Sequence, residues 1–153
     1  MGAAMMISND AERAEELSRR RARALPVLAI LFIAQQVTYY TGSGAGQRTV
    51  DHVHIAAWLV LSVVILLALA TGGGWIYPRR VRDLANDEAT RAHRADAFNS
   101  AFLATMAAAV VLYAIDLFEP MAGREAIHLM MTIGIATALL RFGMLERRAL
   151  RDA

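Results

Sequence analysis

The stretch IAAWLVLSVVILLALATGGGWI, residues 55–76, contains no charged side chain from end to end. A hydrocarbon layer about 30 Å thick needs about 20 helical residues to cross it. Because lipid offers no hydrogen-bond partners to the backbone, such a segment has to be a helix. The stretch therefore predicts a transmembrane helix, and any further span in the chain should have a similar length.

Three further stretches have the same apolar character, and they cover about 25–40, 97–118 and 126–145. Of the 153 residues, 57% are hydrophobic, against about 45–50% in soluble domains. The predicted fold class is all-α. We expect a polytopic membrane protein whose four transmembrane helices form an up-down bundle over residues 25–145. The first span is expected to be retained rather than cleaved as a signal sequence.

The basic residues, all of them arginine, predict the orientation of these spans. Fourteen of the sixteen precede the first span, lie in the loop 77–96 or follow position 140, and only Arg48 and Arg124 lie on the other side. Cytoplasmic segments of membrane proteins carry such an excess. Both termini are therefore predicted to be cytoplasmic, with a charged helix over 1–24 and a tail over 146–153. Topology explains the basic charge, so no nucleic-acid partner is expected.

Several single residues near the ends of the spans have predicted roles. Pro26 is expected in the first turn of the first span, where helices tolerate proline. Trp58 and Trp75 are expected to anchor the two ends of the second span at the lipid interface. Arg141 is expected to extend to water, and Asn86 to cap a helix that runs on into the third span.

Small residues recur at four-residue spacing in the third and fourth spans: Ala101, Thr105 and Ala109, then Gly134 and Ala138. Small side chains let neighbouring helices approach closely. The pattern predicts a tightly packed third span at the centre of the bundle. It is equally typical of a homodimer contact, and the sequence leaves both interpretations open.

The cytoplasmic loop carries the most specific motif, LANDEATRAHRADAFNSAF, residues 84–102. With the apolar span that follows, it resembles a segment of small uncharacterised bacterial inner-membrane proteins with four spans, often encoded beside helix-turn-helix regulators. The resemblance covers about 79–145 and implies an inner-membrane location and a regulatory or accessory role. It would place partner contacts at Asn86, Asp87, Glu88, Thr90 and Arg91. The alternative is that these residues start a helix with a self-paired charged face.

Ionisable residues gather on the predicted outer side. Asp51 and His54 share a helix face, His128 begins the fourth span, and Asp116 ends the third. If the second and fourth spans lie diagonally, the two histidines approach the bundle axis. His54 and His128 could then hold haem or a divalent metal, with Asp51 or Asp116 orienting an imidazole. A proton-sensing or ligand-sensing patch and ordinary interfacial polar residues are the other interpretations.

The spans lack the features of transporters and hydrolases. The apolar stretches 55–75, 97–115 and 129–140 hold no Asp, Glu, His, Lys or Arg, although transporters usually place such a residue near mid-membrane. There is no G-x-S-x-G motif, no phosphate-binding loop and no cysteine. We expect no catalytic residue and no cofactor, and a non-catalytic accessory role through contacts with membrane lipids and a membrane-protein partner or second copy. A haem- or metal-binding, cytochrome b-like protein is the alternative.

The predicted topology is testable by cysteine labelling, because the chain has no native cysteine. A membrane-impermeant maleimide applied to intact cells should label a His52→Cys variant and leave an Ala89→Cys variant unlabelled until the membrane is opened. The opposite pattern would invert every loop assignment.

Overall fold

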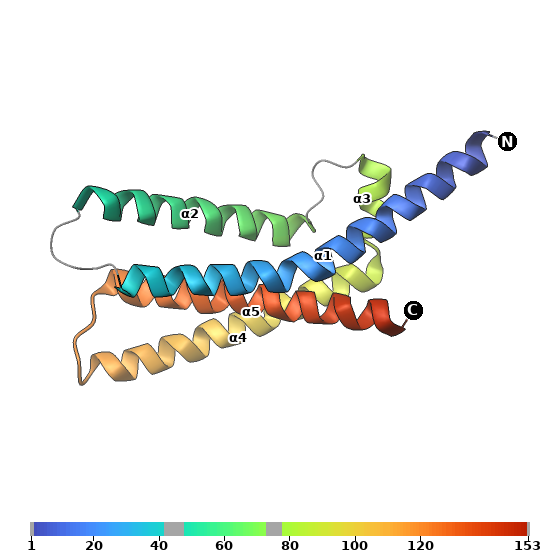
Figure 1. Ribbon diagram of the computed structural model, residues 1–153. Helices are drawn as coiled ribbons and strands as arrows, with labels where there is room; N and C mark the ends of the chain where they lie inside the picture. Colours follow the sequence, from blue (N-terminus) through green and yellow to red (C-terminus); the bar gives the residue numbers. More distant parts are fainter. Residues whose placement is uncertain (1, 42–47, 73–77, 153) are drawn as a thin grey trace.

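The computed structural model describes residues 2–41, 48–72 and 78–152 (Figure 1). Over these ranges the chain forms five helices and no strand, so the all-α prediction is confirmed. Four long helices run side by side, and the short α3 lies near the end where both termini are found (Figure 1). The helices are α1 (Gly2–Thr41), α2 (Arg48–Thr71), α3 (Arg79–Ala85), α4 (Glu88–Asp116) and α5 (Gly123–Asp152).

Two of the described helices, α4 and α5, are long and apolar enough to cross a membrane. In α2 the apolar part, Ile55–Thr71, is shorter. The two long helices differ in burial, since 11% of the most apolar window of α4 is buried against 44% of that of α5. Most of the apolar surface of α4 therefore faces outward.

The central helix is α5, which packs along α1 and α4 and over a shorter part along α2. Its buried residues recur at seven-residue spacing in two rows, His128, Ile135 and Phe142, and Thr132, Leu139 and Glu146. By contrast, α4 buries only Thr90, Ala97 and Ala101. The prediction of a central third span was wrong. Small residues permit a close approach, but they do not decide how many neighbours a helix has.

The predicted segments 1–24 and 25–40 are one continuous helix, α1. Pro26 lies inside this helix, so the prediction that it opens a span in the first turn was wrong. Its ring packs against Gly143 of α5, where an added Cβ would lie 2.8 Å from the proline Cδ. A proline removes one helical hydrogen bond and commonly bends a helix, and the N-terminal part of α1 is inclined to the rest (Figure 1).

Gly72, which follows α2, lies against the side chain of Asn86 at the end of α3. After α2 ends at Thr71, Gly72 adopts a φ of +77°, a conformation that suits glycine. The cap of α4 is Asp87, whose carboxylate accepts a hydrogen bond from the Thr90 backbone N–H at 2.8 Å. Asn86, the predicted cap, ends α3 instead. The 29-residue length of α4 agrees with the single long helix expected there.

The predicted interfacial role of Trp58 was also wrong. Trp58 is 6% exposed and belongs to the core, because α1 and α5 cover its ring. Arg141 donates from Nε to Asp96 Oδ2 at 2.9 Å, an ion pair that joins α5 to α4, and 41% of its side chain is exposed. Its extension to water stays a prediction. Trp75 lies outside the described residues.

The close approach of α4 and α5 depends on Gly134. A Cβ added there would lie 2.5 Å from the hydroxyl oxygen of Thr105. The small-residue spacing noted in the sequence therefore serves contacts between these two helices of one chain.

Replacing Gly134 by valine should separate α4 from α5 at this point. Overpacking of this kind costs about 1–3 kcal/mol, measured as a lower free energy of unfolding during SDS titration in detergent micelles. Gly123→Val is the matched control, because a Cβ there meets nothing within 4 Å. Adding Thr105→Ala to Gly134→Val should restore part of the loss, and equal effects at both glycines would contradict the assignment.

Candidate functional site

The most connected polar group in the described structure is Arg21 of α1, which is 8% exposed. Its guanidinium donates to Glu146 Oε2 of α5, at 2.7 Å from Nη2 and 3.2 Å from Nε. It also donates to the Gly72 carbonyl after α2 and to the Ala85 carbonyl of α3. The remaining acceptors are Asn86 Oδ1 at 3.1 Å and Thr90 Oγ1 at 3.2 Å.

Glu146 is equally engaged, and its side chain is 5% exposed. Its second oxygen, Oε1, accepts hydrogen bonds from the Thr90 hydroxyl and from His93 Nδ1, both at 3.2 Å. The ring of Phe142, one turn earlier on α5, lies 5.4 Å from the Arg21 guanidinium carbon. We call the set the Arg21 cluster: Arg21, Gly72, Ala85, Asn86, Thr90, His93 and Glu146.

The Arg21 cluster is a structural junction. It draws together α1, α3, α4, α5 and the residue that follows α2. A guanidinium stays charged at every physiological pH, so burying it requires a carboxylate and saturated N–H donors, and both conditions are met here. Removing one partner of a buried ion pair costs about 3–5 kcal/mol, because the other charge remains buried without compensation.

The five predicted partner-binding residues of the 84–102 motif divide into two groups. Asn86 and Thr90 point inward and belong to the Arg21 cluster, and Asp87 caps α4. Glu88 and Arg91 are exposed. The candidate partner-binding set is thus partly a set of structural residues. Its outward members are Glu88 and Arg91, and Arg91 Nε donates to the Asp87 carbonyl at 3.4 Å.

At the opposite end of the helices, His128 of α5 has partners that the sequence did not indicate. Its Nε2 pairs with Gln36 Oε1 of α1. Its ring lies against Trp58 of α2, with centroids 4.1 Å apart, and Trp58 in turn stacks on Phe32 of α1 at 6.4 Å. His128 is 7% exposed, so it links three helices from inside the bundle.

Of the other residues of the predicted outer site, the structure describes the side chain of Asp116. Asp116 is exposed, and its carboxylate accepts a hydrogen bond from the Met121 backbone N–H at 2.7 Å, which fixes the turn after α4. The side chains of Asp51 and His54 lie outside those described. Among the described residues, no three His, Asp or Glu side chains gather as metal ligands. A haem or metal held by His54 and His128 stays a prediction.

Three buried polar atoms in the described part of the bundle have no hydrogen-bond partner: Gln36 Nε2, Trp58 Nε1 and Ser62 Oγ. Gln36 and Trp58 belong to the His128 contacts, and Ser62 lies one helical turn along α2 from Trp58. A buried donor without an acceptor costs about 1–3 kcal/mol. Polar groups at this end are therefore less completely satisfied than those of the Arg21 cluster.

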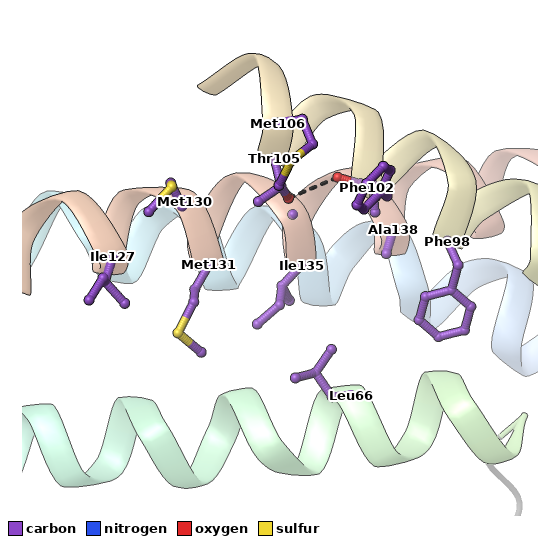
Figure 2. Close-up of a pocket in the computed structure, with 12 residues that line it drawn as sticks. Leu66, Phe98, Phe102, Thr105, Met106, Ile127, Met130, Met131, Ile135 and Ala138 are labelled. Atoms are coloured by element: carbon purple, nitrogen blue, oxygen red, sulfur yellow. Dashed lines mark hydrogen bonds between the residues drawn. The ribbon is translucent and has the colours of Figure 1, made fainter. Parts of the chain in front are cut away.

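An apolar groove of about 540 Å³ lies between α2, α4 and α5 (Figure 2). Leu66 of α2 faces Met131 and Ile135 of α5 across it, and Phe98 of α4 lies at its side (Figure 2). Its lining includes the small residues Gly134 and Ala138. No ionisable side chain lines the groove, so it suits an apolar occupant.

Sequence reasoning missed Arg21, Glu146, Gln36 and Trp58 as buried partners. A seven-residue repeat could have found three of them. On α1, Gln36 lies seven residues after Ala29, and Arg21 belongs to the same buried stripe, whereas on α5 Glu146 lies seven residues after Leu139. Arg21 and Glu146 both lie beside several arginines in the sequence, so local composition alone predicts an exposed charged segment at each of them.

The Arg21–Glu146 pair should dominate stability. Arg21→Met or Glu146→Gln alone should cost about 3–5 kcal/mol of unfolding free energy. The combined Arg21→Met and Glu146→Gln change should cost less than the sum of the two single changes. Arg20→Met and Glu16→Gln are the matched controls. That pair joins neighbouring positions at 2.6 Å but is exposed, so it is worth about 0.3–0.5 kcal/mol. Additive single effects would contradict the coupling.

Comparison of the chain with protein-family models, with curated proteins and with solved structures gives no match. The function is therefore argued from the geometry described above.

Proposed function

We propose that this chain is a bacterial inner-membrane protein with four spans and both termini in the cytoplasm, and that it has a non-catalytic accessory role exercised through contacts with a protein partner. The single observation that carries the proposal is the apolar surface of the helices. Exposed apolar side chains recur along α1, α2, α4 and α5, among them Ile30, Val60, Phe102 and Val110.

Such a surface is unfavourable in water. Monomeric soluble proteins rarely expose an apolar patch larger than a few hundred Å², whereas here all four long helices expose large apolar residues. On α4 the exposed set continues from Phe98 to Ile115, and the exposed Leu117 and Phe118 follow the end of the helix. A lipid surround removes the cost of this exposure. The fourteen arginines at one end fit the cytoplasmic side of such a bilayer.

The cytoplasmic corner formed by α3 and the start of α4 is the surface proposed for the partner. Leu84, Glu88 and Arg91 are exposed there, and Leu84 has 53% of its surface accessible. An apolar residue ringed by charged ones is typical of protein interfaces. The corner is held rigidly from behind, because Arg21 binds the Ala85 carbonyl, Asn86 and Thr90.

The corner is connected to the long helices through the hydrogen bonds of Arg21. A partner that shifts α3 or the first turn of α4 would disturb the acceptors of Arg21, and Arg21 also binds α5 through Glu146. A contact at the corner is therefore coupled to the packing of the long helices. This arrangement supports a regulatory role for the proposed contact.

The test combines Leu84→Asp with Arg91→Glu. The double variant should lose the protein that co-purifies with the wild-type chain from mild detergent, while membrane insertion stays intact. Asp87 is left unchanged because it caps α4. The matched control is Glu12→Lys with Arg13→Glu, which reverses the charges of two exposed residues on α1. It should retain the partner. Recovery of the same partner with both variants would contradict the proposed surface.

A further inference from the structure

A second pocket, of about 410 Å³, lies between α1 and α5. Its lining consists of Arg19, Ala22, Arg23, Arg147 and Leu150. A volume of this size falls within the range of about 300–1,000 Å³ that small-molecule sites occupy. Three of the five lining residues are arginines, so the charge of the pocket suits an anion.

The positive charge of this pocket is mostly uncompensated. Arg19 pairs with Glu15 at 2.6 Å. Within the part of the chain that the structure describes, Arg23 and Arg147 make no hydrogen bond and no ion pair. Glu146, the neighbour of Arg147, points the other way and binds Arg21. The two free guanidinium groups are therefore available to an external oxyanion, which arginine binds in a bidentate manner.

The pocket lies at the border between the charged end and the apolar surface. Arg23 precedes the exposed Val27 by one helical turn, and Arg147 follows the exposed Met144 by three residues. In the proposed membrane placement this border is the depth of the lipid phosphates. Leu150 and the buried Ala22 add an apolar wall beside the arginines.

We propose that this pocket binds the phosphodiester headgroup of an anionic phospholipid, with Arg23 and Arg147 as the principal ligands and Arg19 at its edge. Basic pockets between helices on the cytoplasmic side are known to hold such headgroups. The inference rests on the proposed membrane placement and is independent of the proposed protein partner.

Binding there would clamp α1 to α5. Arg23 follows Arg21 by two residues, and Arg147 is adjacent to Glu146, so a phosphate bridging Arg23 and Arg147 joins the same two helices as the Arg21–Glu146 ion pair. An anionic lipid should therefore raise the resistance of the folded chain to unfolding.

The experiment measures the thermal unfolding midpoint of the full chain reconstituted in phosphatidylcholine bilayers, with and without phosphatidylglycerol. Phosphatidylglycerol should raise the midpoint of the wild-type chain. Arg23→Gln with Arg147→Gln should remove more than half of that increase. Arg79→Gln with Arg80→Gln is the matched control, because it removes two exposed arginines from α3, outside the pocket, and it should keep the increase.

The outcomes separate the possible sources of phosphate. Equal responses of the two double variants would overturn the site, since general attraction between arginine and anionic lipid would then explain the effect. An equal increase with inorganic phosphate in phosphatidylcholine alone would overturn the lipid assignment in favour of a soluble anion. A chain that does not enter bilayers at all would instead contradict the proposed membrane placement.

Discussion

The buried ion pair between Arg21 and Glu146 is the interaction on which the arrangement of the helices depends. Its two residues are 125 positions apart in the chain. The guanidinium also donates to the carbonyls of Gly72 and Ala85 and to the side chains of Asn86 and Thr90. A buried charge tolerates little displacement, because any acceptor that moves away leaves a desolvated N–H donor unpaired. This constraint fixes the relative rotation and height of α1, α4 and α5 at one end.

The two ends of the molecule differ in how completely their polar groups are satisfied. At the Arg21 end, Glu146 uses both oxygens and Arg21 donates from all three of its nitrogens. At the opposite end, His128 is held by Gln36 and Trp58, yet Gln36 and Trp58 each keep an unpaired buried donor. The helices are thus held by specific polar geometry at one end and mainly by ring contacts and apolar packing at the other.

The contacts of α5 explain why one helix can organise the others. It carries Glu146 for the ion pair, Gly143 for the ring of Pro26, Gly134 for Thr105 and His128 for Gln36. Each is small or polar at the point where a neighbour approaches. By comparison α2 touches α5 over a short part only, which leaves the groove beside Leu66 open. The proposed membrane surround would cover the apolar faces that this packing leaves exposed.

The sequence alone determined that the chain is helical, where the long helix after Asp87 runs, and how arginine is distributed between its segments. These properties depend on local composition and spacing, so a single chain segment is enough to predict them. The tertiary structure decided which arginine is buried, that α5 is central, and that Gln36 and Trp58 meet His128. Those outcomes depend on the rotation and offset of helices that are distant in the chain. No local pattern specifies which side chains such a rotation brings into contact, because a turn of a helix about its axis exchanges one set of neighbours for another.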